Sequence, residues 1–215
     1  MTTDRPAALR EIPGPMGPLE ALLEMPVGAP RAVVVLGHPL PTGGGTMHTK
    51  MIFQAAKGLA RAGCAVLRFN FRGVGRSAGA FDEGRGEQDD FRAAIDFVEA
   101  RFPGLEIWAG GGSFGSWVGM TVASLDPRVS ARIGIAPPVH KYDFSTVIAT
   151  AKPIFLVHGE EDELIPVGLI REFYAKLQEP KELVVIDRAN HLFEGQAGEV
   201  GEALEDLLKD YSARA

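Results

Sequence analysis

The most informative segment of this chain reads Ile107-Trp108-Ala109-Gly110-Gly111-Gly112-Ser113-Phe114-Gly115-Ser116-Trp117. Its apolar first part is typical of a strand, and the residues from Phe114 onward are typical of a helix. Between them lies Gly-x-Ser-x-Gly, whose glycines allow a sharp turn without a Cβ collision. A serine held on such a turn, beside a base and facing amide donors, is activated as a nucleophile. The pattern predicts a nucleophile elbow at Ser113; the alternative is a turn serine at a helix start.

Two later segments supply the partners that such a serine needs. The apolar run 153–158 is followed by Gly159-Glu160-Glu161-Asp162, and the run 182–186 is followed by Arg188-Ala189-Asn190-His191. The order serine, acid, histidine differs from the order of the chymotrypsin and subtilisin triads. Each candidate follows a predicted strand, so the combination is far more specific than Gly-x-Ser-x-Gly alone in a chain with 26 glycines.

Composition limits the class of protein. The chain has 215 residues, 46% hydrophobic and 23% charged, with a net charge of −6. We expect a single domain over residues 1–215. No window approaches the roughly 18 uncharged apolar residues of a membrane span, so no membrane partner is expected. The acidic balance, without a Lys/Arg cluster on a predicted helix, argues against nucleic acid. The first residues lack the apolar core of a secretory signal, which predicts a cytoplasmic protein.

Strands and helices are expected to alternate along the chain. Residues 1–30 are expected to form an N-terminal β-hairpin, with strands 8–12 and 19–25 around a Pro/Gly-rich turn. Residues 32–36 are apolar without alternation, as in a strand buried on both faces of a parallel sheet. Further strands are expected at 65–70, 105–109, 132–136, 154–158 and 183–186, and helices at 47–61, 87–101, 114–125, 167–177 and 196–211. This rhythm predicts an α/β fold with a mostly parallel central sheet and helices on both faces.

The connection between the strands ending near Ala136 and beginning near Ile154 is short. It has fewer than about twenty residues, whereas a lid would be a long insertion with its own elements. We therefore expect an open site without a lid domain.

Four phrases carry a resemblance to a known family: Gly37-His38-Pro39-Leu40-Pro41-Thr42-Gly43-Gly44-Gly45-Thr46-Met47, Phe69-Asn70-Phe71-Arg72-Gly73-Val74-Gly75-Arg76-Ser77, Phe81-Asp82-Glu83-Gly84-Arg85-Gly86-Glu87 and His158-Gly159-Glu160-Glu161-Asp162. With Ser113 and His191 they make the chain resemble the α/β-hydrolase superfamily over nearly its whole length. Within it, the chain is similar to small bacterial hydrolases without a lid, akin to carboxylesterases and dienelactone hydrolases. The resemblance implies the α/β-hydrolase fold and esterase activity. Dienelactone hydrolases carry cysteine at the elbow and haloalkane dehalogenases aspartate, so Ser113 favours acyl transfer.

His191 is the expected base, but it competes with the other histidines. His38 and His158 lie in or at the ends of apolar strands, where a core or loop-pinning hydrogen bond is the expected role. His48 and His140 fall in loops near strand carboxyl ends, where ligands bind in open α/β sheets, and are candidates for substrate contact.

Asp162 is the expected carboxylate partner of His191. It lies in an acidic cluster with Glu160, Glu161 and Glu163, and the alternative is a solvated turn. A short carboxylate that follows the strand and Gly159 can reach the imidazole, hold its tautomer and stabilise the imidazolium.

The oxyanion hole needs backbone donors. The amide of Phe114 is the first candidate, because it lies at the positive end of the following helix. Leu40 is the second, by analogy with the His-Gly-x donor position of relatives, since Pro39 has no N–H. The run Gly43-Gly44-Gly45 could cradle phosphate, but no Gly-Lys-Ser/Thr continuation follows it.

Arg72 and Arg76 could hold an anionic group of a substrate, and Arg72 is the third candidate for substrate contact. The competing interpretation is an ion pair with Asp82, Glu83 or Glu87.

The sequence thus predicts a serine esterase that cleaves small-molecule carboxylic esters through an acyl-enzyme, with Ser113, His191 and Asp162 as a triad. No cofactor and no metal are expected. Two alternatives stay open: a thioesterase or acyltransferase, and a non-catalytic ligand-binding protein of the same fold. Ser77 is a fallback nucleophile without an elbow.

Overall fold

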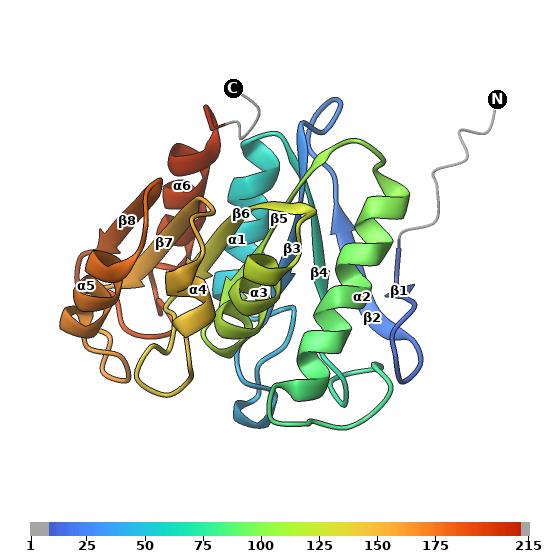
Figure 1. The fold of residues 1–215 in the computed structure, drawn as a ribbon, viewed down its shortest axis with the longest axis horizontal. Helices are drawn as coiled ribbons and strands as arrows, with labels where there is room; N and C mark the ends of the chain where they lie inside the picture. Colours follow the sequence, from blue (N-terminus) through green and yellow to red (C-terminus); the bar gives the residue numbers. More distant parts are fainter. Residues whose placement is uncertain (1–8, 212–215) are drawn as a thin grey trace.

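The computed structural model describes residues 9–211, which form one twisted sheet with helices packed on both faces (Figure 1). The strands are β1 (Glu11–Ile12), β2 (Leu19–Glu24), β3 (Ala32–Gly37), β4 (Cys64–Phe69), β5 (Glu106–Gly112), β6 (Val129–Ile135), β7 (Ile154–Gly159) and β8 (Lys181–Ile186). The helices are η1 (Pro41–Gly43), α1 (Lys50–Arg61), α2 (Arg85–Arg101), α3 (Phe114–Leu125), α4 (Ser145–Ala149), α5 (Val167–Lys176) and α6 (Ala197–Leu208).

The sheet is mostly parallel, as the sequence predicted. Its strand order is β1-β2-β4-β3-β5-β6-β7-β8. The first hairpin, β1 with β2, is antiparallel and attaches to the sheet through an antiparallel pairing of β2 with β4, whereas all later pairs are parallel. Residues 1–8 of the expected hairpin, including the first residue of its predicted strand 8–12, lie outside the described residues.

The central strands are mostly apolar because both of their faces are covered, although β4 and β6 also bury Arg68 and Arg132. Alternate residues of a strand point to opposite faces, so in β3 Val34 and Leu36 join the core beneath α1 and α6. Val33 and Val35 join the core beneath α2 and α3 on the other side. Helices α4 and α5 lie on the same side as α3, where Phe144 and Phe173 extend the core. The resulting frame fixes the strand ends from which the site loops emerge.

The structure differs from the sequence prediction around α1 and in two short helices. Helix α1 begins at Lys50 and not at 47, because Met47 is fixed to the neighbouring strand: its amide donates to Asn70 Oδ1 at 2.8 Å and its carbonyl accepts from Arg68 at 2.7 Å. Helices η1 and α4 were not expected; α4 begins where the Ser145 amide donates to Asp143 Oδ1 at 2.8 Å.

The connection between β6 and β7 carries only α4, a helix of five residues. It adds no lid over the carboxyl end of the sheet. Within residues 9–211, no helix is both long and apolar enough to cross a membrane.

Candidate active site

Ser113 lies at the tight turn between β5 and α3. Its backbone has φ 48° and ψ −120°, a conformation that non-glycine residues seldom adopt. Four hydrogen bonds hold its backbone. The Ser113 amide donates to Ile135 O at 2.8 Å, and the Ser113 carbonyl accepts from the Ser116 amide at 2.9 Å, the Ser116 hydroxyl at 2.6 Å and the Trp117 amide at 3.4 Å. The strained turn presents the Ser113 hydroxyl at the carboxyl edge of the sheet, as in a nucleophile elbow.

The flanking glycines serve close packing more than the turn itself. Gly111 and Gly115 have no left-handed backbone, since Ser113 makes the turn. A Cβ on Gly115 would lie 2.4 Å from the carbonyl carbon of Gly37, and one on Gly111 would lie 2.2 Å from the Gly37 oxygen. Glycine at these two positions therefore allows the start of α3 to press against the end of β3.

The structure brings Ser113, His191 and Asp162 together from the loops after β5, β8 and β7. His191 Nε2 lies 3.0 Å from Ser113 Oγ, and His191 Nδ1 lies 2.8 Å from Asp162 Oδ2. The other carboxylate oxygen, Oδ1, accepts the backbone amides of Leu164 at 2.9 Å and Ile165 at 2.8 Å. An imidazole held in this way carries its proton on Nδ1 and leaves Nε2 free to accept one from the hydroxyl.

Asp162 is buried, yet it is held as a carboxylate. Burial, the largest single influence, raises the pKa of Asp162, whereas the hydrogen bonds from His191 and from the Ile165 amide are the largest influences that lower it. The net pKa of Asp162 lies below its ordinary value. A permanent negative charge next to Nδ1 stabilises an imidazolium when the ring takes up a proton.

His158 supports this carboxylate loop from inside the protein. The fully buried ring donates from Nε2 to the Ile165 carbonyl at 2.9 Å and lies 3.6 Å from Asp162 Oδ2. Burial lowers the pKa of His158, which keeps the ring neutral. The contact matches the loop-pinning role that the sequence predicted.

Both predicted oxyanion donors line the cavity at Ser113. This cavity has a volume of about 410 Å³, and its walls are mostly apolar, from Pro39, Leu40, Phe114, Pro138, Tyr142, Leu164, Ile165 and Leu192. Among the described residues, the amides of Leu40 and Phe114 donate to no protein acceptor. Two unused backbone donors beside a serine hydroxyl are what a developing oxyanion requires.

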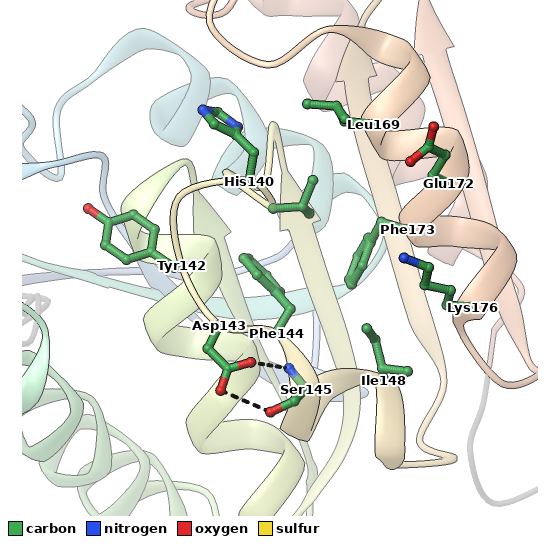
Figure 2. A pocket seen from close by; sticks show the side chains of 11 residues that line it. His140, Tyr142, Asp143, Phe144, Ser145, Ile148, Leu169, Glu172, Phe173 and Lys176 are labelled. Atoms are coloured by element: carbon green, nitrogen blue, oxygen red, sulfur yellow. Dashed lines mark hydrogen bonds between the residues drawn. The ribbon is translucent and has the colours of Figure 1, made fainter.

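A second cavity of about 310 Å³ adjoins the first and shares His140 and Tyr142 with it. Figure 2 shows it between the segment that carries these two residues and α5, which contributes Leu169 and Phe173. Tyr142 is stacked on Trp117 with ring centres 4.3 Å apart, which fixes the wall between the two cavities. Of the three predicted substrate-contacting residues, His140 is the one that reaches the cavity at Ser113.

His48 lies elsewhere. It lines a separate cavity with Arg10, Glu20 and Arg76 near the N-terminal hairpin, and it is absent from the walls of the cavity at Ser113. Met47, which is hydrogen-bonded to Asn70 and Arg68, lines the same separate cavity.

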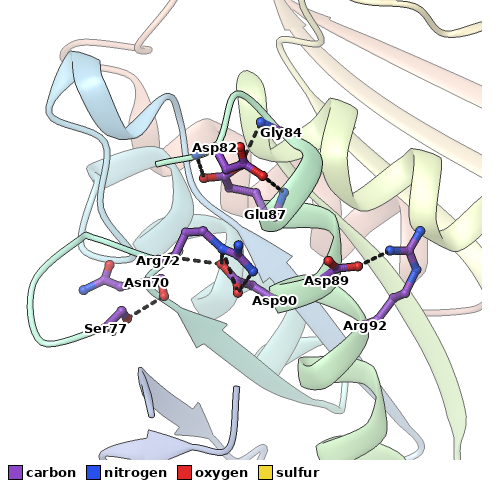
Figure 3. Close-up of polar contacts among 10 residues, drawn as sticks. Asn70, Arg72, Ser77, Asp82, Gly84, Glu87, Asp89, Asp90 and Arg92 are labelled. Atoms are coloured by element: carbon purple, nitrogen blue, oxygen red, sulfur yellow. Dashed lines mark hydrogen bonds and ion pairs between the residues drawn. The ribbon is translucent and has the colours of Figure 1, made fainter. Parts of the chain in front are cut away.

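Arg72 forms a structural ion pair in this fold, as the competing interpretation expected, but its partner is a different carboxylate. Its buried guanidinium pairs with buried Asp90 at 2.8 Å, and not with Asp82, Glu83 or Glu87 (Figure 3). Glu87 is already used by the amides of Asp82 at 2.9 Å and Gly84 at 2.7 Å. Arg72 does not line the cavity at Ser113.

Replacing Arg72 by alanine is expected to lower the free energy of unfolding by about 3–5 kcal/mol, because Asp90 would stay buried without its counter-charge. Denaturant unfolding measures the loss. The matched control is Arg85→Ala, which removes an exposed pair with Asp82 and should cost less than about 1 kcal/mol. Equal losses in the two variants would contradict the structural role of Arg72.

Ser77, the fallback nucleophile, has both sides of its hydroxyl occupied. It donates to the Asn70 carbonyl at 2.7 Å and accepts the Glu20 amide at 2.9 Å. The hydroxyl joins β2 to the loop after β4, and Ser77 lines none of the cavity at Ser113.

A mostly parallel sheet with a serine elbow after β5, and an acid and a histidine after β7 and β8, defines an α/β hydrolase. The chain belongs to the family described as serine aminopeptidase, S33 (Hydrolase_4), whose profile matches residues 28–152. An α/β serine hydrolase homologue from Coxiella burnetii is 37% identical, with a TM-score of 0.87 over 92% of this chain and 95% of that one.

Two further relatives are similar to this chain over most of its length. XC6422 from Xanthomonas campestris, described as an α/β serine hydrolase without a lid, is 36% identical, with a TM-score of 0.85 over 93% of this chain and 92% of its own. Protein RP471 of Rickettsia prowazekii (strain Madrid E) is 32% identical over 204 residues, which are 91% of this chain and 86% of the relative. The chain is thus a member of the α/β serine hydrolases that lack a lid.

Proposed function

We propose that this protein is a serine esterase that cleaves carboxylic esters of small molecules. The observation that carries the proposal is the continuous set of contacts from Ser113 Oγ to His191 Nε2 at 3.0 Å and from His191 Nδ1 to Asp162 Oδ2 at 2.8 Å. As Ser113 Oγ attacks the ester carbonyl, His191 Nε2 takes its proton, and Asp162 stabilises the imidazolium without taking the proton itself.

The tetrahedral intermediate carries its negative charge on the former carbonyl oxygen. The amides of Leu40 and Phe114 face this charge as donors, and the positive end of α3 adds to their effect. When the intermediate collapses, the imidazolium gives its proton to the departing alcohol and an acyl group remains on Ser113. Water then attacks this acyl-enzyme, with His191 acting again as the base.

The walls of the cavity favour an apolar acyl or alcohol group. Exposed Leu164 and Leu192 stand beside Ile165 on one wall, and Tyr142 lines the cavity as well. Because no lid covers this cavity, an ester in solution reaches Ser113 without a closing step.

Labelling with a fluorophosphonate probe tests the proposal. An activated serine displaces fluoride and forms a covalent phosphonate ester, which mass spectrometry maps to one peptide. We expect the label on Ser113 and its complete loss in Ser113→Ala. The control is Ser77→Ala, which removes the fallback hydroxyl and should be labelled as the wild type is. No labelling of the folded wild type would support the non-catalytic alternative.

A substrate panel separates the neighbouring activities. The proposal expects turnover of p-nitrophenyl esters. Preference for acyl-coenzyme A would indicate a thioesterase, and transfer to an added alcohol in place of water would indicate an acyltransferase. An aminoacyl p-nitroanilide tests the activity named in the family description, which requires cleavage of an amide.

A further inference from the structure

His38 is fully buried in the loop after β3, and both of its ring nitrogens are occupied. The Phe71 amide donates to His38 Nε2 at 3.1 Å, so Nε2 is the acceptor and carries no proton. The proton is therefore on Nδ1, which donates to the Pro39 carbonyl at 2.7 Å. Burial lowers the pKa of His38 to about 4, so this neutral tautomer persists at neutral pH.

The Pro39 carbonyl and the Leu40 amide belong to one peptide unit. In a trans peptide the C=O and N–H groups point in opposite directions. Holding the Pro39 oxygen on the His38 side therefore turns the Leu40 N–H away from His38. Pro39 and Leu40 both line the cavity that contains Ser113, whereas the His38 ring does not.

Hydrogen bonds and close packing also fix the part of the loop that follows Pro39. The Leu40 carbonyl accepts the amides of Gly43 and Gly45, each at 3.0 Å. Gly45 packs so tightly that a Cβ on it would lie 2.1 Å from the Pro39 oxygen. The carbonyls of Pro39 and Leu40 thus both accept hydrogen bonds. The Leu40 amide itself donates to no protein group among the described residues.

We propose that His38 is a positioning residue for the oxyanion hole: its Nδ1–H orients the Pro39–Leu40 peptide so that the Leu40 N–H faces the oxygen that becomes negative during catalysis. The inference rests on the proposed esterase function. It assigns a role to a buried histidine that touches neither the substrate nor the reacting atoms, and it acts through a hydrogen bond that is kept throughout the reaction.

Two conservative variants separate the hydrogen bonds of the ring. In His38→Asn the side-chain amide can stand at the position of Nδ1 and donate to Pro39, but nothing replaces Nε2. In His38→Gln the side-chain oxygen can stand at the position of Nε2 and accept from Phe71, but nothing donates to Pro39. Both variants lose one buried hydrogen bond, so their costs in stability are similar.

The measurement is the steady-state hydrolysis of p-nitrophenyl acetate, together with the affinity for a trifluoromethyl ketone, which binds serine as an oxyanion. We expect kcat of His38→Asn within about tenfold of the wild type and kcat of His38→Gln lower by about 100-fold, the usual cost of one oxyanion donor. The affinity of His38→Gln for the ketone should fall by a similar factor, with KM little changed.

Two further variants control for a loss of stability and test the position of the loop by a second route. Val33→Ala, in the core of β3 and away from the cavity, lowers stability without touching the loop and should keep the wild-type kcat. Gly45→Ala leaves His38 intact but forces the Pro39 oxygen to move, and should lose kcat as His38→Gln does. It keeps the test valid if His38→Gln fails to fold.

Equal kcat values for His38→Asn and His38→Gln, or a wild-type kcat in Gly45→Ala, would overturn the role of His38. A wild type that neither hydrolyses esters nor binds the ketone would overturn the proposed function instead, so the two failures are distinguishable.

Discussion

Alanine at Ser113 or at His191 is expected to lower kcat for ester hydrolysis about 10⁶-fold, and alanine at both positions is expected to lower it no further. The two groups act as a unit, because the hydroxyl needs the base 3.0 Å away to lose its proton, and the base has no other function in the attack. Once either group is missing, only the oxyanion donors and substrate binding continue to assist the reaction.

The measurement compares kcat of the two single variants and the double variant with a p-nitrophenyl ester, after thermal melting has verified that each is folded. His191→Ala should fold, because Asp162 keeps its hydrogen bonds from the amides of Leu164 and Ile165. If His191→Ala stays near the wild-type rate, the base is a different residue, and His140 is the next histidine at this cavity. A double variant much slower than both single variants would show that the two residues act independently.

The central sheet could be predicted because most inner strands are short apolar runs without alternation. Residues 32–36 and 154–158 fall within β3 and β7, and residues 114–125 coincide with α3. The ends of other elements shifted where a distant contact competed with the local pattern, as at α1, where Asn70 and Arg68 hold Met47 outside the helix. Local propensity contains no information about such a contact.

The meeting of Ser113, Asp162 and His191 could be predicted from a simple rule. Each residue follows a parallel strand, and the carboxyl ends of parallel strands lie along one edge of the sheet. The rule brings loops together without stating which side chains touch. The rule therefore placed His48 and His140 equally near the site. The structure distinguishes them, because His140 lines the cavity at Ser113 and His48 lines another.

The partner of Arg72 could not be predicted from the sequence, because the carboxylates nearest to Arg72 along the chain accept hydrogen bonds from backbone amides. Glu87 accepts the amides of Asp82 and Gly84 ahead of α2, and Asp82 accepts the Gly86 amide at 3.1 Å. Asp90, one turn further along α2, is the carboxylate left for the guanidinium. A sequence shows which side chains are charged, but it does not show which carboxylates accept hydrogen bonds from the backbone.

Asp162→Asn is expected to lower kcat about 10⁴-fold while the fold is retained. The asparagine oxygen can still accept the amides of Leu164 and Ile165, so the loop keeps its shape. Its NH₂ group then faces His191 Nδ1, which has to accept a hydrogen bond and gives up its proton. The ring proton moves to Nε2, where it meets Ser113 Oγ and prevents the ring from taking the hydroxyl proton.

The matched control is Glu161→Gln, which makes the same change of charge one residue earlier on an exposed side chain. Its kcat should stay within about twofold of the wild type, since it removes no contact of His191 and surface charge changes have small effects. The assay is steady-state turnover of p-nitrophenyl acetate. Equal losses of kcat in the two variants would show that the total charge of the acidic cluster around Asp162 matters, and not the carboxylate at His191 Nδ1.

The lowered pKa of Asp162 adds a test that is independent of turnover. A carboxylate whose pKa is lower in the folded chain stabilises that chain above its ordinary pKa of 3.8, and this contribution is lost as the pH falls through the lowered value. Asparagine does not titrate. The free energy of unfolding of the wild type should therefore exceed that of Asp162→Asn at pH 7, and the difference should narrow below pH 3.8. A difference that stays constant with pH would mean that His191 and the Ile165 amide do not hold Asp162 as a carboxylate.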